Sequence, residues 1–349
     1  MQTNTLEQQL FEQIREGKKI GKEISLERAL LIANGVDEEG RLLRYLNDIN
    51  SIYFDFITDE DFESDPNKTI DEQALRFASD MYNSLAGLRV MGTGAGEFLL
   101  TKAIDMVINN DKLEPLDCFG MTQIYTILSK QLGLNISVVE ENEHVFNRMK
   151  VNGKTYDIDH RLLDRIELQR FPEGIEHDTS SLVAFTYIKR ADRENAKGNY
   201  GDAIELYTKA ILVDPEFSDR AYINRAGIRI DQEKYEDARE DFEKAISIDA
   251  EDFTGHIGLA FVEYYLKNYD EAMRHVNNAG EIYALNSDLY YTRALVQYDQ
   301  DKKVDALRNC SIALGLENDH EGALDLKNII TRENKDAHRR RLNRFKVLH

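Results

Sequence analysis

Three residues in the middle of the chain have the types and the order needed for nucleophilic chemistry: Cys118, His144 and Asp159. An imidazole that removes the proton of a thiol makes it a strong nucleophile, and a carboxylate can hold that imidazole in a productive orientation. This combination suggests attack of a cysteine on an amide carbonyl. The prediction depends on the elements that position the three side chains, because each residue alone usually has a packing or hydrogen-bonding role.

The segment around Cys118 predicts the start of a helix. Pro115 to Thr122 precedes an amphipathic pattern from Gln123 to about Leu132, which Gly133 closes. Cys118 then falls in the first helical turn, where unpaired N–H groups and the helix dipole stabilise a thiolate.

The other two residues lie on a predicted β-hairpin. Residues 144–151 and 154–159 flank Asn152-Gly153, a strong signal for a two-residue turn. That turn pairs Arg148 with Asp157 as salt-bridge partners and Phe146 with Asp159. Alternation divides the side chains into two faces. The face expected to pack on the core carries Val145, Met149, Val151, Tyr156 and Ile158, and the other carries His144, Phe146, Arg148, Asp157 and Asp159. His144 is then a diagonal neighbour of Asp159.

These motifs carry a family resemblance. Cys118-Phe119-Gly120, His144-Val145-Phe146 and the strand from Gly153 to Asp159 resemble the transglutaminase-like superfamily, over about residues 98–163. The resemblance implies a papain-like α+β fold, with Cys118 as nucleophile, His144 as base, Asp159 as orienting acid, and no cofactor. Some members of that superfamily are inactive. The sequence departs from the pattern at Thr155-Tyr156, where tryptophan is usual, and at His160, where proline is common.

The sequence gives weaker signals for two other kinds of site, a zinc site and a phosphate-binding loop. Cys118, His144, Asp159 and His160 could hold zinc, but no paired spacing of cysteines or histidines supports a metal site. The glycine-rich segment 92–96 lacks the Gly-Lys-Ser/Thr ending of a phosphate-binding loop, and it is interpreted as a loop.

The C-terminal part shows a period of about 34 residues, which is typical of tetratricopeptide repeats. The pattern predicts four helix pairs over residues 184–320, in which small residues let paired helices approach and large ones fill the gaps. The small residues of the first helices are Ala191, Ala226, Ala260 and Ala294, and the aromatic position before them holds Tyr187, Tyr222, His256 and Tyr290. Residues 321–349 are expected to form a capping helix, to about Thr331, and a basic tail. The capping residues would be Ala323, Leu324, Ile329 and Ile330.

Such an array predicts a groove for a protein or peptide, lined by the first helices. It resembles the repeats that grip a C-terminal carboxylate with Lys and Asn only at Asn224, because Ile188 and Asp192 occupy the other positions. Cys310 falls at a packing position of the last pair. The order of the parts resembles bacterial transglutaminase-like proteins with C-terminal tetratricopeptide repeats.

The N-terminal part is expected to be a domain of residues 1–178, helical over 1–90 and with its α+β core at 91–165. Ser25 is positioned to cap a helix that ends before Gly35, and a second helix is expected from Asp37 to about Ile49. The predicted fold class is therefore an α+β papain-like or transglutaminase-like domain with extra N-terminal helices, followed by an all-α solenoid.

Composition limits the partners. The formal charge is −20, which disfavours nucleic acid and anionic membranes as partners. The start of the sequence lacks a signal-peptide pattern and the two cysteines form no disulfide framework, so a cytoplasmic location is expected. The basic residues at 339–346 are interpreted as a solvated helix end, with a small anion-binding tail as the alternative.

Two functions follow from these patterns. The first is a cysteine-dependent amide hydrolase or acyl transferase that holds its protein substrate with the repeats. The alternative is a catalytically inactive adaptor, in which the repeats hold the partner and the N-terminal domain performs no reaction.

Overall fold

A computed structural model describes most of the chain, and it divides into two compact units. The described residues are 5–58, 100, 104, 118–141, 144–159, 167–168 and 175–347, and among them the side chains of 55–58, 118, 141, 144, 167, 168, 175 and 337–347 are not described. One unit comprises residues 1–190 with 209–217, and the other comprises 191–208 with 218–349. The division passes through two helices, α7 (Ser181–Ala196) and α8 (Tyr200–Val213).

Three helices open the N-terminal unit: α1 (Leu6–Arg15), α2 (Leu26–Ala33) and α3 (Glu39–Thr58). The predicted cap of α2 is confirmed, because the Ser25 hydroxyl accepts a hydrogen bond from the Arg28 N–H at 3.1 Å. Gly35 follows α2 with a φ of +91°, the left-handed conformation that commonly ends a helix. The third helix is longer than the sequence suggested.

Helix α6 (Cys118–Gln131) begins at the predicted cysteine and is the central helix of this unit. Every residue from Phe119 to Ser129 is buried. The prediction of an amphipathic helix was therefore wrong, since a helix that is covered on all sides belongs to the interior. The reason is tertiary, because α6 has partners in the sheet, in α2 and in α7.

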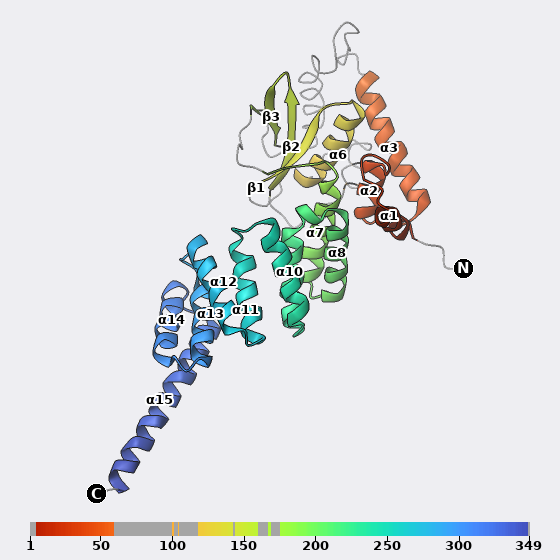
Figure 1. Ribbon diagram of the computed structural model, residues 1–349. Coiled ribbons are helices and arrows are strands. Elements are labelled where there is room, and N and C mark those ends of the chain that lie inside the picture. Colours follow the sequence, from red (N-terminus) through yellow and green to blue (C-terminus); the bar gives the residue numbers. More distant parts are fainter. Residues whose placement is uncertain are drawn as a thin grey trace. The chain divides into compact units, whose positions relative to one another are not determined.

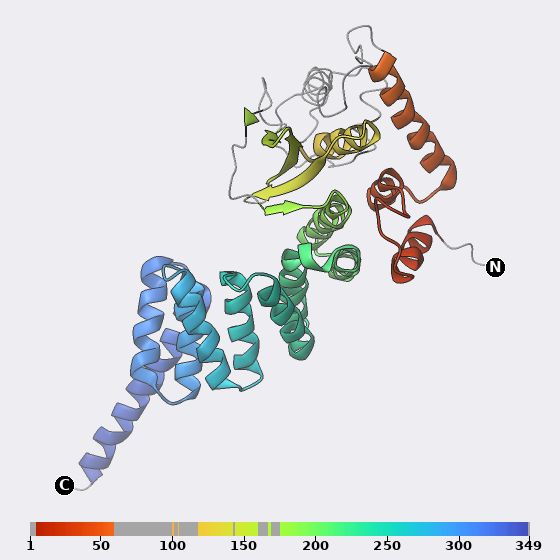
Figure 2. The ribbon, with the colours of Figure 1, turned by 45° about the horizontal axis from the view of Figure 1, so that its top comes forward.

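A five-stranded antiparallel sheet lies beside α6, with the strand order β4-β3-β2-β1-β5 (Figure 1, Figure 2). Its strands are β1 (Ile136–Glu141), β2 (His144–Val151), β3 (Lys154–Ile158), β4 (Glu167–Leu168) and β5 (Ile175–His177). The predicted turn is present, with φ of 51° at Asn152 and 72° at Gly153. The predicted pair Arg148–Asp157 is also confirmed, and Val151 pairs with Lys154 beside the turn.

The hairpin face that was expected to pack on the core is buried, but the opposite face is buried as well. Met149 is fully buried on one face, and Asn147 on that face donates to the Thr126 hydroxyl of α6 at 2.7 Å. Phe146, Arg148 and Asp157 on the other face are equally buried. Alternation sorts side chains between faces, but it does not say that only one face is covered.

The first repeat helix is part of the N-terminal core. The Tyr187 hydroxyl donates to Glu7 at 3.1 Å, and the Arg190 guanidinium donates to the Ala33 carbonyl at 2.6 Å. Thr186 accepts a hydrogen bond from Gln123 at 2.9 Å. Helix α7 thus fixes α1, α2 and α6 to one another in this unit.

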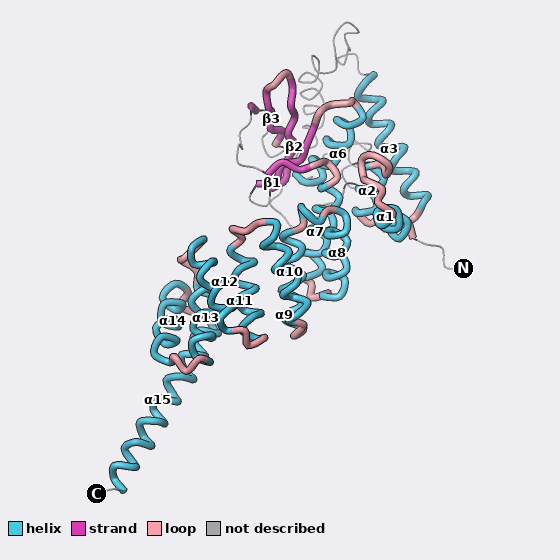
Figure 3. Tube along the Cα trace, viewed as in Figure 1, coloured by secondary structure: helices cyan, strands magenta, loops and turns pink. Residues whose placement is uncertain are grey.

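The remainder of the chain is helical (Figure 3). Helices α7 and α8 are followed by α9 (Asp219–Asp231), α10 (Tyr235–Ile248), α11 (Phe253–Tyr265), α12 (Tyr269–Ile282), α13 (Ser287–Asp299) and α14 (Lys303–Leu316). The small residues of the repeat pattern are fully buried, as Ala226, Ala260 and Ala294 show. Gly258 has a comparable role, since a Cβ at that position would lie 2.3 Å from the Phe242 ring.

The last helix, α15 (Glu321–Val347), caps the array and continues past the last pair (Figure 1). Ala323, Leu326 and Ile330 are buried against α13 and α14 together with Cys310, which confirms Cys310 as a packing residue. The predicted capping roles of Leu324 and Ile329 were wrong. Both are almost half exposed, because the helix turns a different stripe toward its neighbours.

Candidate functional site

The start of α6 and the start of β2 meet in the N-terminal unit. The Thr122 hydroxyl, one turn after Cys118, donates to the Val145 carbonyl at 3.2 Å. Val145 directly follows His144, the first residue of β2. This bond brings the helical turn of Cys118 to the strand end of His144. The side chains of both residues lie outside the described set, so the contact between the thiol and the imidazole stays a prediction.

Asp159 is the third residue of the predicted Cys–His–Asp triad. It directly follows β3, and the last pair in the register is Asn147 with Ile158, so Asp159 continues toward the start of β2. Its side chain is 1% exposed. That Asp159 orients the imidazole of His144 stays a prediction.

A buried chain of amides and hydroxyls positions α6. Asn34, which follows α2, donates to the Gln123 side-chain oxygen at 3.1 Å and accepts from the Leu100 N–H at 3.0 Å. Gln123 in turn donates to Thr186 of α7 at 2.9 Å. Because these polar groups are satisfied only in this arrangement, they fix the rotation of α6 about its axis.

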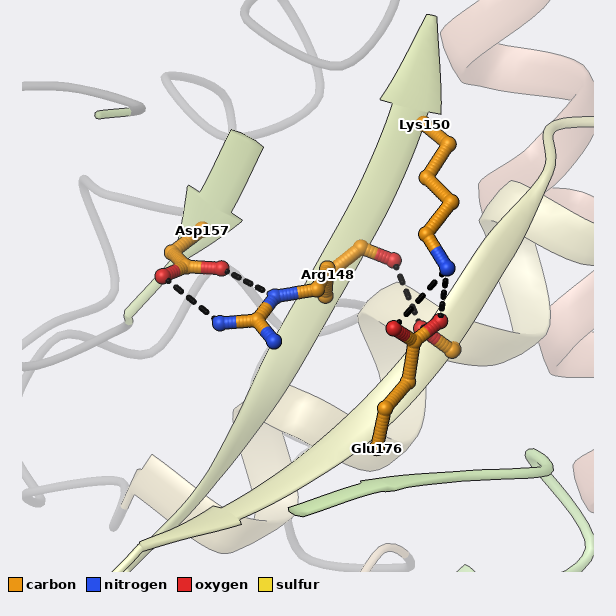
Figure 4. A network of polar contacts seen from close by, with 5 residues as sticks. Arg148, Lys150, Asp157 and Glu176 are labelled. Carbon is orange, nitrogen blue, oxygen red and sulfur yellow. Dashed lines mark hydrogen bonds and ion pairs between the residues drawn. The ribbon is translucent and has the colours of Figure 1, made fainter. Parts of the chain in front are cut away.

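Asp157 serves the sheet as a structural ion-pair partner. The Arg148 guanidinium donates to its two carboxylate oxygens at 2.7 and 3.1 Å (Figure 4). On the same face, Lys150 and Ser137 donate to Glu176, and these bonds lower the pKa of Glu176 although its partial burial raises it. Asp157 is thus the salt-bridge partner of Arg148, as predicted.

A metal site has no support within the described residues. They contain no group of three or more His, Cys, Asp and Glu side chains that could hold an ion. His160 and the glycine-rich segment 92–96 lie outside them.

Repeats that grip a C-terminal carboxylate need a Lys or Asn at the position that Asp192 occupies in this chain. Here that position carries a carboxylate instead. Asp192 accepts hydrogen bonds from Asn224 at 3.0 Å, from Arg220 at 3.0 Å and from the Tyr207 hydroxyl at 2.7 Å. A ligand carboxylate at this place would meet the negative charge of Asp192. Asn224 is thus engaged within the protein.

The third repeat contains a pair of buried histidines in contact, which was not predicted from the sequence. His256 and His275 bring their Nδ1 atoms within 3.0 Å. Arg274, which can only donate, lies 2.8 Å from His275 Nε2, so His275 carries its proton on Nδ1 and donates to His256. His256 then donates from Nε2 to the Ala250 carbonyl at 3.2 Å. The His275 ring is neutral in this arrangement.

This pair predicts acid sensitivity of the repeats. Burial, Arg274 and His256 lower the pKa of His275 to about 4, from an ordinary value of 6.5. The unfolded chain therefore binds the proton first as the pH falls, and stability present at pH 7 is lost between about pH 6.5 and 4. We expect a loss of about 2 kcal/mol from pH 7 to 5. Urea unfolding measures it, and a His275→Gln variant should lack that component. Parallel losses in the two proteins would contradict the prediction.

A second missed feature is a group of aromatic rings at one end of the third repeat. The sequence signal was the run of aromatic residues Phe261, Tyr264, Tyr265 and Tyr269. Their rings contact one another in pairs, with centroids 4.8–6.2 Å apart. The spacing of these aromatic residues fits the repeat pattern. That pattern does not distinguish rings that pack in the core from rings that are exposed, so the group was not predicted.

None of the helices in the described part of the chain has the length and apolar character needed to cross a membrane.

Comparison with known proteins identifies the repeats. Residues 219–252 match the tetratricopeptide repeat family. A relative from Schizosaccharomyces pombe, the DnaJ homolog subfamily C member 7 homolog, is 30% identical over 135 residues, and the match covers 35% of this chain and 28% of the relative. The chain thus spans little more than a quarter of the curated relative that it matches.

Solved structures also match. A MamA crystal structure is 18% identical with a TM-score of 0.39, covering 47% of this chain and 88% of that chain. A thermophilic tetratricopeptide protein of Thermus thermophilus, also 18% identical with a TM-score of 0.39, covers 43% of this chain and 84% of that chain. Residues 219–252 thus match a tetratricopeptide repeat, and the helix pairs from α7 to α14 form an all-α array around it.

Proposed function

We propose that the chain is an adaptor that binds a protein partner through its tetratricopeptide repeats. The observation that carries this proposal is the array of helix pairs, of which residues 219–252 match the repeat family. Each first helix of such an array contributes to one continuous groove, which suits an extended or helical peptide segment. Since Asp192 occupies the clamp position, the partner would be held by side-chain contacts along the groove.

A groove variant tests the adaptor function. Gly227 lies one turn after Asn224 on α9, and a Cβ at this position would meet nothing within 4 Å. Gly227→Glu therefore obstructs the groove without disturbing packing. We expect affinity capture with the full chain to recover partners that the Gly227→Glu chain loses and that a control variant, Glu243→Lys on the exposed side of α10, retains. Equal recovery by all three chains would overturn the groove as the binding surface.

A second candidate function is cysteine chemistry in the N-terminal unit. It is favoured by the hydrogen bond from Thr122 to Val145, which brings the turn of Cys118 to the strand end of His144, and by the buried Asp159. We propose that His144 takes the thiol proton and that the sulfur bonds to an amide carbonyl carbon. The carbon–nitrogen bond then breaks, and the proton passes to the leaving amine. Water or another amine attacks the thioester, and the sulfur leaves as thiolate. These roles and a transglutaminase-like fold rest on the family resemblance.

Alkylation rates test this chemistry. Burial raises the pKa of the Cys310 thiol to about 11, so Cys310 is an unreactive internal control. With iodoacetamide at pH 6.5, we expect Cys118 to react at least tenfold faster than glutathione, because a paired thiol is ionised at that pH. His144→Ala should abolish the difference, as read by peptide mass spectrometry. A Cys118 that reacts no faster than glutathione, with no effect of His144→Ala, would overturn the nucleophile.

A further inference from the structure

The fourth repeat shows how this solenoid holds a cation against a tyrosine. The Lys303 ammonium lies 5.9 Å from the centre of the Tyr298 ring and 3.2 Å from the Glu333 carboxylate. The Tyr298 hydroxyl donates to the same carboxylate at 2.9 Å. Ring, cation and carboxylate thus form one unit, in which the ring face and the acid both attract the ammonium.

One repeat earlier along the array, a ring of the third repeat and a carboxylate at the end of α13 correspond to the ring and the carboxylate of this unit, without the cation. A shift of one repeat, 34 residues, carries Tyr298 to Tyr264 and Glu333 to Asp299, and it carries Lys303 to Tyr269. Tyr269 donates to Asp299 at 3.3 Å, as Tyr298 does to Glu333. Within the described part of the chain, no lysine or arginine forms an ion pair with Asp299, whose side chain is exposed. The position that corresponds to Lys303 is occupied by the aromatic residue Tyr269.

Two further tyrosines extend this surface. Tyr265 stacks on Tyr235 with centroids 4.8 Å apart and planes 7° from parallel, and 44% of Tyr265 is exposed. We name the group of Tyr235, Phe261, Tyr264, Tyr265, Tyr269 and Asp299 the tyrosine patch. Tyr265 is the exposed ring of the patch, and an exposed tyrosine that is held by stacking loses little freedom on binding, which makes it an effective contact residue.

The negative charge of the residues around the tyrosine patch favours a positively charged ligand. Residues 253–301 contain seven acidic and three basic side chains, within a chain of net charge −20. Burial raises the pKa of Tyr264 well above its usual value, and Asp299 raises it further, so the phenol stays neutral and its ring keeps a negative face. An acidic or phosphorylated segment would be repelled by these carboxylates, whereas a basic segment would be attracted.

We propose that the tyrosine patch binds an arginine- or lysine-containing peptide segment of the partner protein, with one cationic side chain against the tyrosine rings and Asp299. This inference rests on the adaptor function and names the chemistry of its partner. The incoming cation contacts Asp299 as Lys303 contacts Glu333, and it lies against the exposed Tyr265 ring because Tyr269 occupies the position that corresponds to Lys303. Arginine fits best, because its planar group stacks on a ring while donating to a carboxylate.

Peptide binding to the full chain tests the proposal. The probes are a fluorescein-labelled (Gly-Arg)₄ peptide and its neutral (Gly-citrulline)₄ counterpart, followed by fluorescence anisotropy at low salt. We expect the arginine peptide to bind and the citrulline peptide to bind at least tenfold more weakly. Tyr265→Ala and Asp299→Asn should each weaken the arginine peptide about five- to tenfold, since each removes a cation contact.

Matched controls separate the patch from diffuse attraction to an acidic chain. Tyr283→Ala removes a tyrosine that is 51% exposed elsewhere in the same repeat, and Asp319→Asn removes one exposed charge outside the patch. Both should leave the affinity within twofold of the wild type. Equal effects of Asp299→Asn and Asp319→Asn, with no effect of Tyr265→Ala, would overturn the patch as the site. If partner capture still depended on Gly227 in that case, the adaptor function would stand and this inference alone would fail.

Discussion

Replacing Arg148 by methionine is expected to lower the free energy of unfolding of the N-terminal unit by about 3–5 kcal/mol. The side chains of Arg148 and Asp157 are only 3% and 1% exposed, and their contact is bidentate. Methionine has a similar length and keeps the apolar contacts, but it removes the bidentate contact of the guanidinium with the buried Asp157 carboxylate. Urea unfolding followed by the circular dichroism signal measures the loss.

A neighbouring pair supplies the control for this prediction. Lys150 and Glu176 form an ion pair at 2.8 Å on the same sheet face, but their side chains are 52% and 32% exposed (Figure 4). Water stabilises the separated charges there, so Lys150→Met should cost less than about 1 kcal/mol. The double variant Arg148→Met with Asp157→Leu removes both buried charges and should recover much of the loss. Similar effects of Arg148→Met and Lys150→Met would show that burial does not decide the strength of these pairs.

The second large effect is expected at Asp241 in the second repeat. Its carboxylate accepts from Arg225 at 2.9 and 2.6 Å and from Arg229 at 2.6 Å, and its side chain is 4% exposed. Asp241→Asn preserves the shape but leaves two guanidinium groups beside each other without a compensating charge. We expect a loss of about 3 kcal/mol, because both cations remain largely buried.

Hydrogen exchange with denaturant unfolding locates this effect. Repeats are stabilised mainly by their neighbours, so protection should fall first in α9 and α10 and then in the adjacent helices. Glu243→Gln on the same helix is the control, since its contact with Arg239 is 4.0 Å long and exposed. It should change stability by less than about 0.5 kcal/mol. Loss of protection confined to the N-terminal unit would contradict the assignment of Asp241 to the stability of the repeats.

Local signals in the sequence predicted the features that depend on neighbouring residues. Asn152 and Gly153 adopt positive φ with little strain, so the hairpin turn and the pairing of Arg148 with Asp157 followed directly. Ser25 capped α2 as predicted, because a cap needs only the first turn of its own helix. The repeat period predicted helix pairs, since each small residue must face the partner helix.

The candidate site was predictable only in part. The start of α6 at Cys118 and the start of β2 at His144 were expected from the sequence, and the bond between Thr122 and Val145 brings these two backbone ends together. The tyrosine patch and the histidine pair were not predicted. Their residues lie in different helices, and repeat patterns describe only the positions that pack in every copy.

The sequence by itself determined the hairpin turn, the cap of α2, the pairing of β2 with β3 and the repeat period, because each depends on residues close together in the chain. Tertiary structure alone decided which faces are covered. It buried α6 on all sides and both faces of β2, and it left Leu324 exposed while burying Leu326. It also joined α7 to the N-terminal core through Thr186, Tyr187 and Arg190. Burial depends on what packs from distant parts of the chain, and residue periodicity does not contain that information.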